Sequence, residues 1–344
     1  MRLSATLATL TAMFVIPFPG MGHTTAVADS PVEAGAVDNV RDSVEAAITL
    51  AVPYLERAGE AWIEKRQCVS CHQVPFMLWS LSAAAEQGYK IDRDRLRDWT
   101  AWSVDVRSFV KPEQKDDLEP ASTLAANIDT LTALLLGLPN QEGLESNKQS
   151  GRVNWRQSFA NALVENQLAE GSWQPCGQLP AQKRPLQETT QVTTAWTMLA
   201  LHHEGVSPEH MPTALSTLQN DTPASTEWWV ARLLLANQLS DAQAAFFRQE
   251  LINKQHSDGG WGWLTDDPSD ALATGMALYA LCHHQEGKDG KAIAAAVRFL
   301  TSNQSPDGFW KVPGTKKTTR NKPTPTSNYW GTAWAVIGLL ESER

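Results

Sequence analysis

Apolar and polar positions repeat with helical spacing over most of the chain. Amphipathic segments, such as residues 292–300, precede segments that are apolar on most faces, such as residues 331–340. A helix with one apolar stripe covers a core from outside, whereas a helix that is apolar all round is itself buried. No strand-like alternation competes at length. The pattern therefore predicts an all-α fold of outer and inner helices.

The alternation of outer and inner segments occurs six times. The predicted pairs are residues 44–55 with 74–85, 96–106 with 121–138, and then pairs within 155–203, 208–239, 242–284 and 291–340. Six pairs can close into a ring, and closure removes the two exposed ends that an open array must cap. The sequence thus predicts a single α6/α6 toroid over residues 44–344, after a linker at 29–43.

A motif of the form Q-x3-G-x-W recurs in the turns between outer and inner segments. Its copies run over residues 167–173, 255–261 and 304–310, and residues 218–229 fit a degenerate fourth copy. The motif resembles the QW motif of the squalene–hopene cyclase and protein prenyltransferase superfamily, whose fold is an α/α toroid of six hairpins. In that motif Gln ties down a helix end and Trp stacks on the turn. We therefore expect Trp173, Trp261 and Trp310 to be packing residues.

The resemblance implies an enzyme that acts on an isoprenoid in a central cavity. Class II terpene cyclases protonate their substrate from a D-x-D-D motif, which the run from Asp266 to Asp270 does not match. No zinc triad like that of the protein prenyltransferases is found either. The isoprenoid enzyme is therefore kept as an alternative function.

The first 28 residues read as a secretory signal peptide. Arg2 precedes an apolar stretch at residues 3–18, and Ala26-Val27-Ala28 forms a small-x-small cleavage site. The stretch is short for a bilayer-spanning helix and is broken by Pro17, although an uncleaved anchor is the other interpretation. No later run is long and apolar enough to span a membrane. We expect a bacterial protein that is periplasmic or secreted, with no transmembrane segment after cleavage.

The sequence Cys68-Val-Ser-Cys71-His72 has the form C-x-x-C-H, which is the attachment sequence of c-type haem. Two thiols on one turn can bond the two vinyl groups, and the following histidine can bind the iron. The motif predicts one covalent haem c, with His72 as the proximal ligand. A redox disulfide remains an alternative, as does another metal site, although the other two cysteines, Cys176 and Cys282, stand far apart.

The haem turn at residues 68–72 lies between the outer and inner segments of the first pair. Because the inner helices of such a ring all begin at one end, we expect the haem at that mouth of the cavity. Met77 would lie on the proximal side, and the histidines at positions 202, 203, 283 and 284 lie about 15–20 Å from the mouth. His256 is left as the candidate for the sixth iron position, with Met276 or no ligand as the alternatives.

Other residues are predicted to lie at the same mouth. Asp266, Asp267 and Asp270 precede the fifth inner segment, where they either begin a helix or face the cavity. Tyr329 and Trp330 open the sixth inner segment, where they either line the cavity or belong to the core. The stretch 311–322, rich in Lys, Pro and Thr, reads as a loop over this mouth.

Composition narrows the choice of function. The 344 residues include 29 Lys and Arg against 38 Asp and Glu, and the resulting net charge of -9 argues against a nucleic-acid partner. The leading interpretation is an exported c-type haem protein that performs redox chemistry or electron transfer at the cavity mouth. Its redox partner or small-molecule substrate is not identified. The alternatives are the isoprenoid enzyme and a haem sensor or binding scaffold without turnover.

Overall fold

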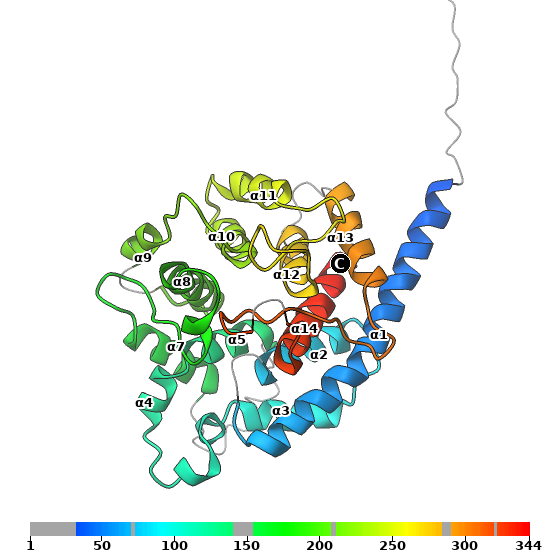
Figure 1. Ribbon diagram of the computed structural model, residues 1–344. Helices are drawn as coiled ribbons and strands as arrows, with labels where there is room; N and C mark the ends of the chain where they lie inside the picture. Colours follow the sequence, from blue (N-terminus) through cyan, green and yellow to red (C-terminus); the bar gives the residue numbers. More distant parts are fainter. Residues whose placement is uncertain (1–31, 70–72, 140–153, 208–210, 284–289, 320–321) are drawn as a thin grey trace, which may run out of the picture.

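The structure is helical throughout the part of the chain that it describes. The computed structural model (Figure 1) describes residues 32–69, 73–139, 154–207, 211–283, 290–319 and 322–344, and its regular elements there are α-helices and short 3-10 helices. The all-α prediction is confirmed. The predicted signal peptide at 1–28 lies outside the described residues. Within the predicted linker at 29–43, α1 (Val32–Arg66) already begins.

Six of the described helices form a closed inner ring. Each contacts the next, and the last contacts the first. In chain order they are α2 (Val74–Glu86), α5 (Ile128–Gly137), α8 (Leu186–His203), α10 (Thr226–Gln238), α12 (Ala271–His283) and α14 (Pro325–Ser342). They are the segments whose sequence is apolar on most faces, and such helices are stable only when most faces are buried. The predicted toroid of six hairpins is confirmed.

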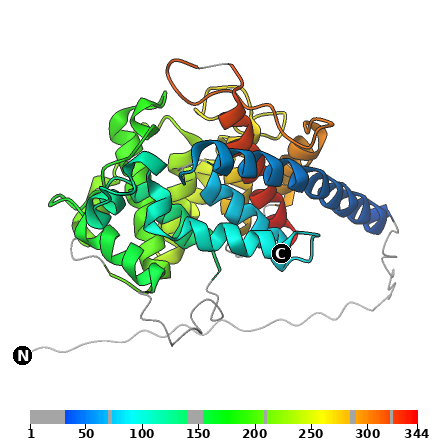
Figure 2. The same ribbon diagram turned by 90° about the horizontal axis from the view of Figure 1, so that it is seen from below.

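A second layer of helices covers the ring from outside. These are α1, α3 (Arg93–Ser103), α7 (Trp155–Glu165), α9 (Met211–Thr217), α11 (Ala244–Asn253) and α13 (Gly290–Ser302), and α4 (Pro120–Ala125) lies in a connection. In α13, Ala292, Ala296 and Leu300 are buried while Lys291 and Arg298 are exposed, as an outer helix requires. Figure 2 shows α1 crossing the outside of α2 and extending beyond the ring.

A helix that spans a membrane must be both long and predominantly apolar. None of the described helices is both long enough and apolar enough to cross a bilayer. The longest, α1, has 35 residues and carries charged side chains along its length. The prediction that no segment spans a membrane therefore holds for the residues that the structure covers.

The Q-x3-G-x-W turns lie between the outer and the inner helix of a pair, and in two of them the Gln side chain also reaches the neighbouring outer helix. In the turn before α12, the Gln255 side chain donates to the carbonyl of Gly259 (2.8 Å) and to that of Ala292 in α13 (2.9 Å). Gly259 has a φ of +90° and abuts the α13 backbone, so a side chain there is excluded. The Trp261 indole is buried and donates to the carbonyl of Leu251 (2.8 Å). The expected structural role of the motif is confirmed.

The inner helices α12 and α14 approach one another at two glycines. A β-carbon on Gly275 would meet the backbone of Trp334 and Ala335, and one on Gly338 would meet the backbone of Gly275. The absence of side chains at these positions allows the two helix backbones to touch. Gly275 and Gly338 therefore set the spacing on this side of the ring.

A loop crosses the end of the ring at which the inner helices begin. This loop, described at residues 311–319 and 322–323, is called the strap, and it forms the later part of the connection from α13 to α14 (Figure 1). The Ser327 hydroxyl of α14 donates to Val312 (2.7 Å) at one end of the strap. Farther along, the N–H of Lys183, just before α8, donates to Thr315 (2.8 Å), and that of Lys317 donates to Ala181 (3.1 Å). Because α8 and α14 lie on opposite sides of the ring, the strap spans the mouth, as the sequence predicts for this loop.

Candidate functional site

Three buried carboxyl groups gather where the inner helices begin, an end of the ring called here the N-terminal mouth. Glu188, Glu227 and Asp270 stand at the starts of the neighbouring helices α8, α10 and α12, and their exposed fractions are 1%, 7% and 5%. Acidic residues are favoured at helix starts, because the helix dipole and the free N–H groups stabilise their negative charge. Helix formation therefore places all three groups at one end of the barrel.

Glu227 is held by a buried guanidinium. Arg184, which is 2% exposed, donates from Nη1 to Oε2 of Glu227 at 2.7 Å. The indole of Trp196 donates to the other oxygen, Oε1, at 3.2 Å. The guanidinium also lies 5.1 Å from the centre of the Trp263 ring. Because both charges have lost their hydration, removing either partner would leave an uncompensated buried charge, so the pair fixes the position of the Glu227 carboxylate.

Glu188 ties the turn before α10 to the start of α8. It accepts hydrogen bonds from the N–H groups of Ala224 (2.7 Å) and Ser225 (2.8 Å) and from the Ser225 hydroxyl. These bonds hold its carboxylate to the backbone. We therefore assign Glu188 a structural task at the mouth.

Asp270 is a buried carboxyl with an altered acidity. It accepts from the N–H of Trp263 and from that of Ala273, each at 2.9 Å, and so caps α12. Burial favours the neutral acid and raises the pKa of Asp270 to about 6, although the backbone hydrogen bonds oppose this change. A carboxyl with this pKa can give and take a proton near neutral pH.

Aromatic rings form the floor of the mouth and continue down the bore of the ring. The rings of Trp263 and Trp330 lie 5.5 Å apart, and Trp330 also contacts Phe76 at 6.1 Å. Deeper in the bore, Trp334 lies 5.4 Å from Trp79 and 5.9 Å from Trp196. The charged groups at the mouth therefore rest on an apolar, aromatic base, which strengthens their electrostatic interactions.

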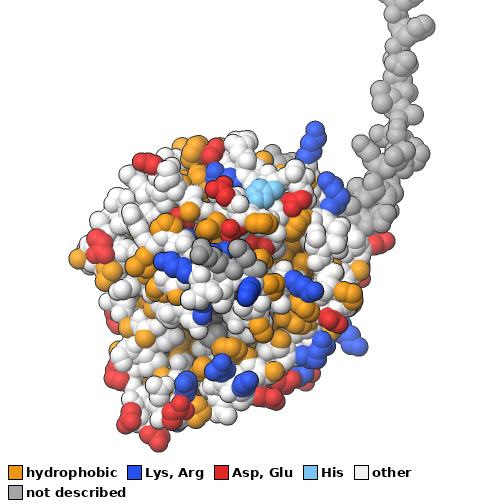
Figure 3. Space-filling model, viewed as in Figure 1, with side chains coloured by type: hydrophobic (Ala, Val, Ile, Leu, Met, Phe, Trp, Pro, Cys, Tyr) orange, Lys and Arg blue, Asp and Glu red, His pale blue; other side chains and the backbone are white. Residues whose placement is uncertain are grey.

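The strap brings basic side chains to the same face. Lys311, Lys317 and Lys322 are exposed and Lys316 is half-buried. Figure 3 shows Lys and Arg side chains gathered around the strap. Beneath it, Lys183 pairs with Asp267 at 2.6 Å. Although the chain as a whole is acidic, this face attracts anions.

The other predicted acidic and histidine residues lie near the mouth in different settings. Asp266 is exposed on the turn before α12. His256 lies in the Q-x3-G-x-W turn, where Nδ1 is 3.0 Å from the Ser269 hydroxyl and Nε2 is 3.0 Å from the Thr265 carbonyl. Both ring nitrogens are thus engaged in hydrogen bonds within the turn. The ring offers neither nitrogen to an iron in this conformation.

The two predicted aromatic residues of α14 contact different parts of the molecule. Trp330 faces the bore, where it meets Trp263. Tyr329 is fully buried on the outer side of the helix, and its hydroxyl donates to the carbonyl of Leu55 in α1 at 3.1 Å. Tyr329 is therefore a contact between the two helical layers, which is the core alternative that the sequence left open for it.

Only part of the C-x-x-C-H motif lies within the described residues. Cys68 is half-buried after α1, its carbonyl accepts from the Trp62 indole at 3.2 Å, and burial raises the pKa of its thiol. Cys71 and His72 lie outside the described residues. Covalent attachment of haem c at Cys68 and Cys71, with His72 as an iron ligand, therefore stays a prediction.

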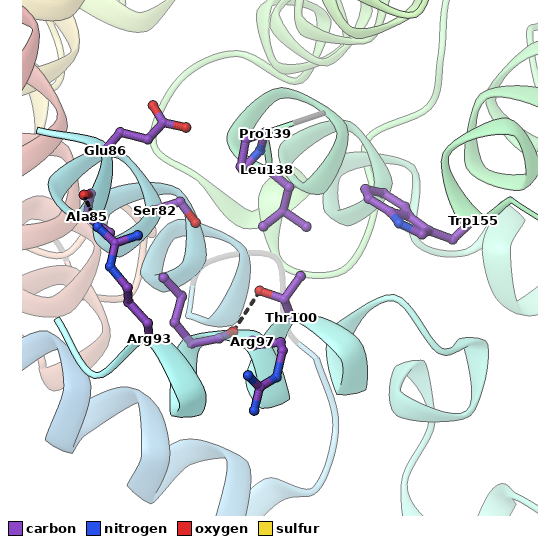
Figure 4. A pocket seen from close by; sticks show the side chains of 10 residues that line it. Ser82, Ala85, Glu86, Arg93, Arg97, Thr100, Leu138, Pro139 and Trp155 are labelled. Carbon is purple, nitrogen blue, oxygen red and sulfur yellow. Dashed lines mark hydrogen bonds between the residues drawn. The ribbon is translucent and has the colours of Figure 1, made fainter. Parts of the chain in front are cut away.

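A pocket of about 120 Å³ lies toward the other end of the ring, between α2, α3 and the end of α5 (Figure 4). Ser82, Leu138 and Trp155 are among its lining residues. The Arg93 guanidinium at its edge donates to the Ala85 carbonyl at 2.7 Å, and the Thr100 hydroxyl donates to Leu96 at 2.8 Å. The charged side chains at this pocket, Glu86, Arg93 and Arg97, are exposed to solvent, whereas the carboxyl groups of the N-terminal mouth are buried. The mouth is therefore the stronger candidate for a functional site.

Comparison with known sequences finds a short match and no family. No family model matches the chain. Drimenyl diphosphate synthase from Streptomyces showdoensis is 35% identical over 61 residues, which are 18% of this chain and 11% of the length of that protein. So short a match does not carry the activity of that protein to this chain.

Comparison with solved structures is more extensive. A possible member of the GH105 family from Salmonella enterica serovar Paratyphi A is similar over 88% of this chain and 93% of its own, with a TM-score of 0.52 and 16% identity. An unsaturated glucuronyl hydrolase from Bacillus sp. GL1, responsible for the degradation of glycosaminoglycan, is similar over 89% and 97%, with a TM-score of 0.53 and 14% identity. At these identities the likeness shows the fold alone.

The expected haem redox or electron-transfer function is wrong. The solved chains that share this toroid include an unsaturated glucuronyl hydrolase and a possible member of the GH105 family, and this likeness points away from haem redox chemistry. The haem sensor is set aside with it, and the isoprenoid enzyme has only the 61-residue match behind it. In its fold, the chain is similar to unsaturated glucuronyl hydrolases.

Proposed function

We propose that the chain is a saccharide-cleaving enzyme whose active site is the N-terminal mouth beneath the strap. The observation that carries the proposal is the pair of buried carboxyl groups, Glu227 and Asp270, on neighbouring inner helices in contrasting surroundings. Glycoside hydrolysis generally uses two carboxyl groups, one as an acid and one as a carboxylate. The fold shared with glucuronyl hydrolases supports the same reaction class by analogy.

The surroundings of the two groups divide the roles. Asp270, whose pKa is raised to about 6 by burial, holds a proton that it can donate to the leaving oxygen. Glu227 is paired with Arg184 and serves as the carboxylate that stabilises positive charge on the sugar in the transition state. Water supplies the hydroxyl group to the sugar carbon and returns a proton to Asp270.

The charge of the strap favours an acidic saccharide. Its lysines stand around the opening, and a uronate carboxylate would be attracted to them. The glucuronyl substrates named for the Bacillus enzyme belong to this chemical class.

The test is hydrolysis of unsaturated glucuronyl disaccharides by the purified chain, with neutral disaccharides alongside. Replacing Asp270 by Asn keeps an acceptor at the start of α12 but removes the proton, and we expect kcat to fall by about 10²–10⁴-fold. Asp266→Asn, which alters an exposed carboxylate on the preceding turn, should leave kcat unchanged. Absence of turnover by the unmodified chain on all these saccharides, or full activity of Asp270→Asn, would overturn the proposal.

A further inference from the structure

Several buried polar atoms have no hydrogen-bond partner among the described residues. At the mouth they include the amide of Gln182, at both Nε2 and Oε1, and the indole Nε1 of Trp263, and Oε1 of Gln73 just before α2 is another. Gln182 and Trp263 are each only 2% exposed. Buried polar groups in folded proteins are nearly always paired, so each exception calls for an explanation.

Gln182 lies next to residues that contact Trp263 and the turn that follows it. Arg184, two residues later, places its guanidinium 5.1 Å from the centre of the Trp263 ring. Lys183 pairs with Asp267, four residues after Trp263, at 2.6 Å. The unpaired amide and the unpaired indole thus belong to one region.

The strap fixes this region from above. Gln182 pairs with Lys316 of the strap through an isolated antiparallel bridge. On either side of that bridge, the N–H of Lys183 donates to Thr315 and that of Lys317 donates to Ala181. The backbone of Gln182 is thus held in place while its side-chain amide is left unpaired.

The unpaired atoms specify the chemistry of a ligand. The amide offers a donor and an acceptor, the indole offers a donor, and none of them is charged. A carboxylate would leave Oε1 of Gln182 without a donor, and an apolar chain would leave all three atoms unpaired. A sugar hydroxyl both donates and accepts, so it can pair with the amide.

We infer that Gln182 and Trp263 form a hydroxyl-binding subsite beneath the strap, and that Gln182 is a specificity-determining residue for the bound saccharide. The inference rests on the proposed function, because it assigns the subsite to the saccharide of the same mouth. It goes beyond that function because it names two uncharged protein groups, the Gln182 amide and the Trp263 indole, to which the ligand must hydrogen-bond. These groups act in addition to the lysines of the strap, which attract the ligand by charge.

The test compares Gln182→Met with the unmodified chain, using an unsaturated glucuronyl disaccharide as the probe in calorimetric binding and in kinetics. Methionine has a similar size but no hydrogen-bonding amide, so we expect Kd and KM to rise by about 10-fold or more, with kcat changed much less. Gln182→Asn, which keeps a shorter amide, should be affected less. Gln178→Met, at an exposed glutamine of the same loop, is the matched control and should bind normally.

A second measurement needs no ligand. Because Gln182→Met removes two unpaired buried atoms, the melting temperature of the free protein should rise while binding weakens. A fall in the melting temperature would mean that the amide supports the fold, and unchanged binding would mean that a buried water satisfies it. Either result overturns the subsite while leaving saccharide cleavage in place. If the unmodified chain neither binds nor cleaves the probe, the proposed function and the subsite both fail.

Discussion

Two features of Asp270 shift its pKa in opposite directions. As the cap of α12 it accepts a backbone hydrogen bond from Ala273, which favours the carboxylate. As a buried group it is stabilised when neutral, and burial is the larger influence on its pKa. A group in this position should couple the stability of the fold to pH.

The coupling has a definite sign. The pKa of Asp270 rises from 3.8 to about 6 on folding, so between these values the folded chain binds more protons than the unfolded chain. The contribution of Asp270 to the free energy of unfolding is therefore greatest below about pH 4 and is lost as the pH rises through about 6, by an amount on the order of 3 kcal/mol. Asp270→Asn lacks this titration.

Urea unfolding of both proteins across this pH range measures the effect. We expect the stability of the unmodified chain relative to Asp270→Asn to decrease as the pH rises. A difference between the two proteins that does not vary with pH would show that the acidity of Asp270 is not altered by the fold.

Single residues also show where sequence analysis stops. Tyr329 and Trp330 are neighbours on a helix that is apolar on most faces, so the pattern does not tell which of them faces the bore. Consecutive side chains of a helix point about 100° apart around its axis. In α14 this difference gives Tyr329 a contact with Leu55 and Trp330 a contact with Trp263. Only the packing of α14 against α1 decides between them.

At the scale of the helices, the contact between α12 and α14 leaves no room for a side chain at Gly275. Gly275→Ala would place a methyl group against the backbone of Trp334, where neither helix can move without displacing its neighbours in the ring. We expect the free energy of unfolding to fall by about 1–3 kcal/mol or more.

Gly290→Ala is the matched control for this substitution. Gly290 begins α13, is exposed, and has no atom within 4 Å of an added β-carbon. Alanine there should leave stability unchanged or raise it slightly, because it restricts the unfolded chain. Thermal unfolding of the two variants provides the comparison, and equal stabilities would contradict the proposed backbone contact.

Part of the candidate site could be predicted from the sequence, because acidic residues are favoured at the starts of helices. Asp270 belongs to an acidic run before an apolar helix, which is a local pattern. The pairing of Glu227 with Arg184 joins residues 43 positions apart, and it depends on how the loop before α8 lies against the start of α10. Gln182 had no signal in the sequence, since its amide stands out only because it is buried without a partner.

At the scale of the whole molecule, the ring is closed by the last Q-x3-G-x-W turn. The Gln304 amide donates to Gly308 in its own turn (3.1 Å) and to Ala47 in α1 (2.9 Å). Gly308 has a φ of +87° and abuts the backbone of Leu50. Gln255 makes the corresponding contacts within the array, where it reaches α13.

The two glutamines allow closure to be tested. Gln304→Leu leaves two carbonyls without this donor, and we expect the free energy of unfolding to fall by about 1–3 kcal/mol. Hydrogen exchange should rise in α1 for Gln304→Leu and in α13 for Gln255→Leu, because each variant loosens the outer helix that its turn holds. Equal exchange in α1 for both variants would show that this turn does not secure the closure.

The toroid could be predicted because its signals are local and repeated. Each hairpin has its own apolar inner segment, and the copies at Trp173, Trp261 and Trp310 mark the turns. The function could not be predicted in the same way. The C-x-x-C-H motif is also local, but it led to a redox function that the fold comparison contradicts.

Closure of the ring sets an order for folding during synthesis. The inner helix α2 packs between α1, α5 and α14, and the Gln87 side chain at its end donates to the carbonyl of Leu340, 253 residues away, at 3.0 Å. One flank of the earliest hairpin therefore stays bare until the final helix leaves the ribosome. Contacts between such distant segments slow folding, and a nascent chain interrupted before its last hairpin would present this uncovered apolar flank to aggregation.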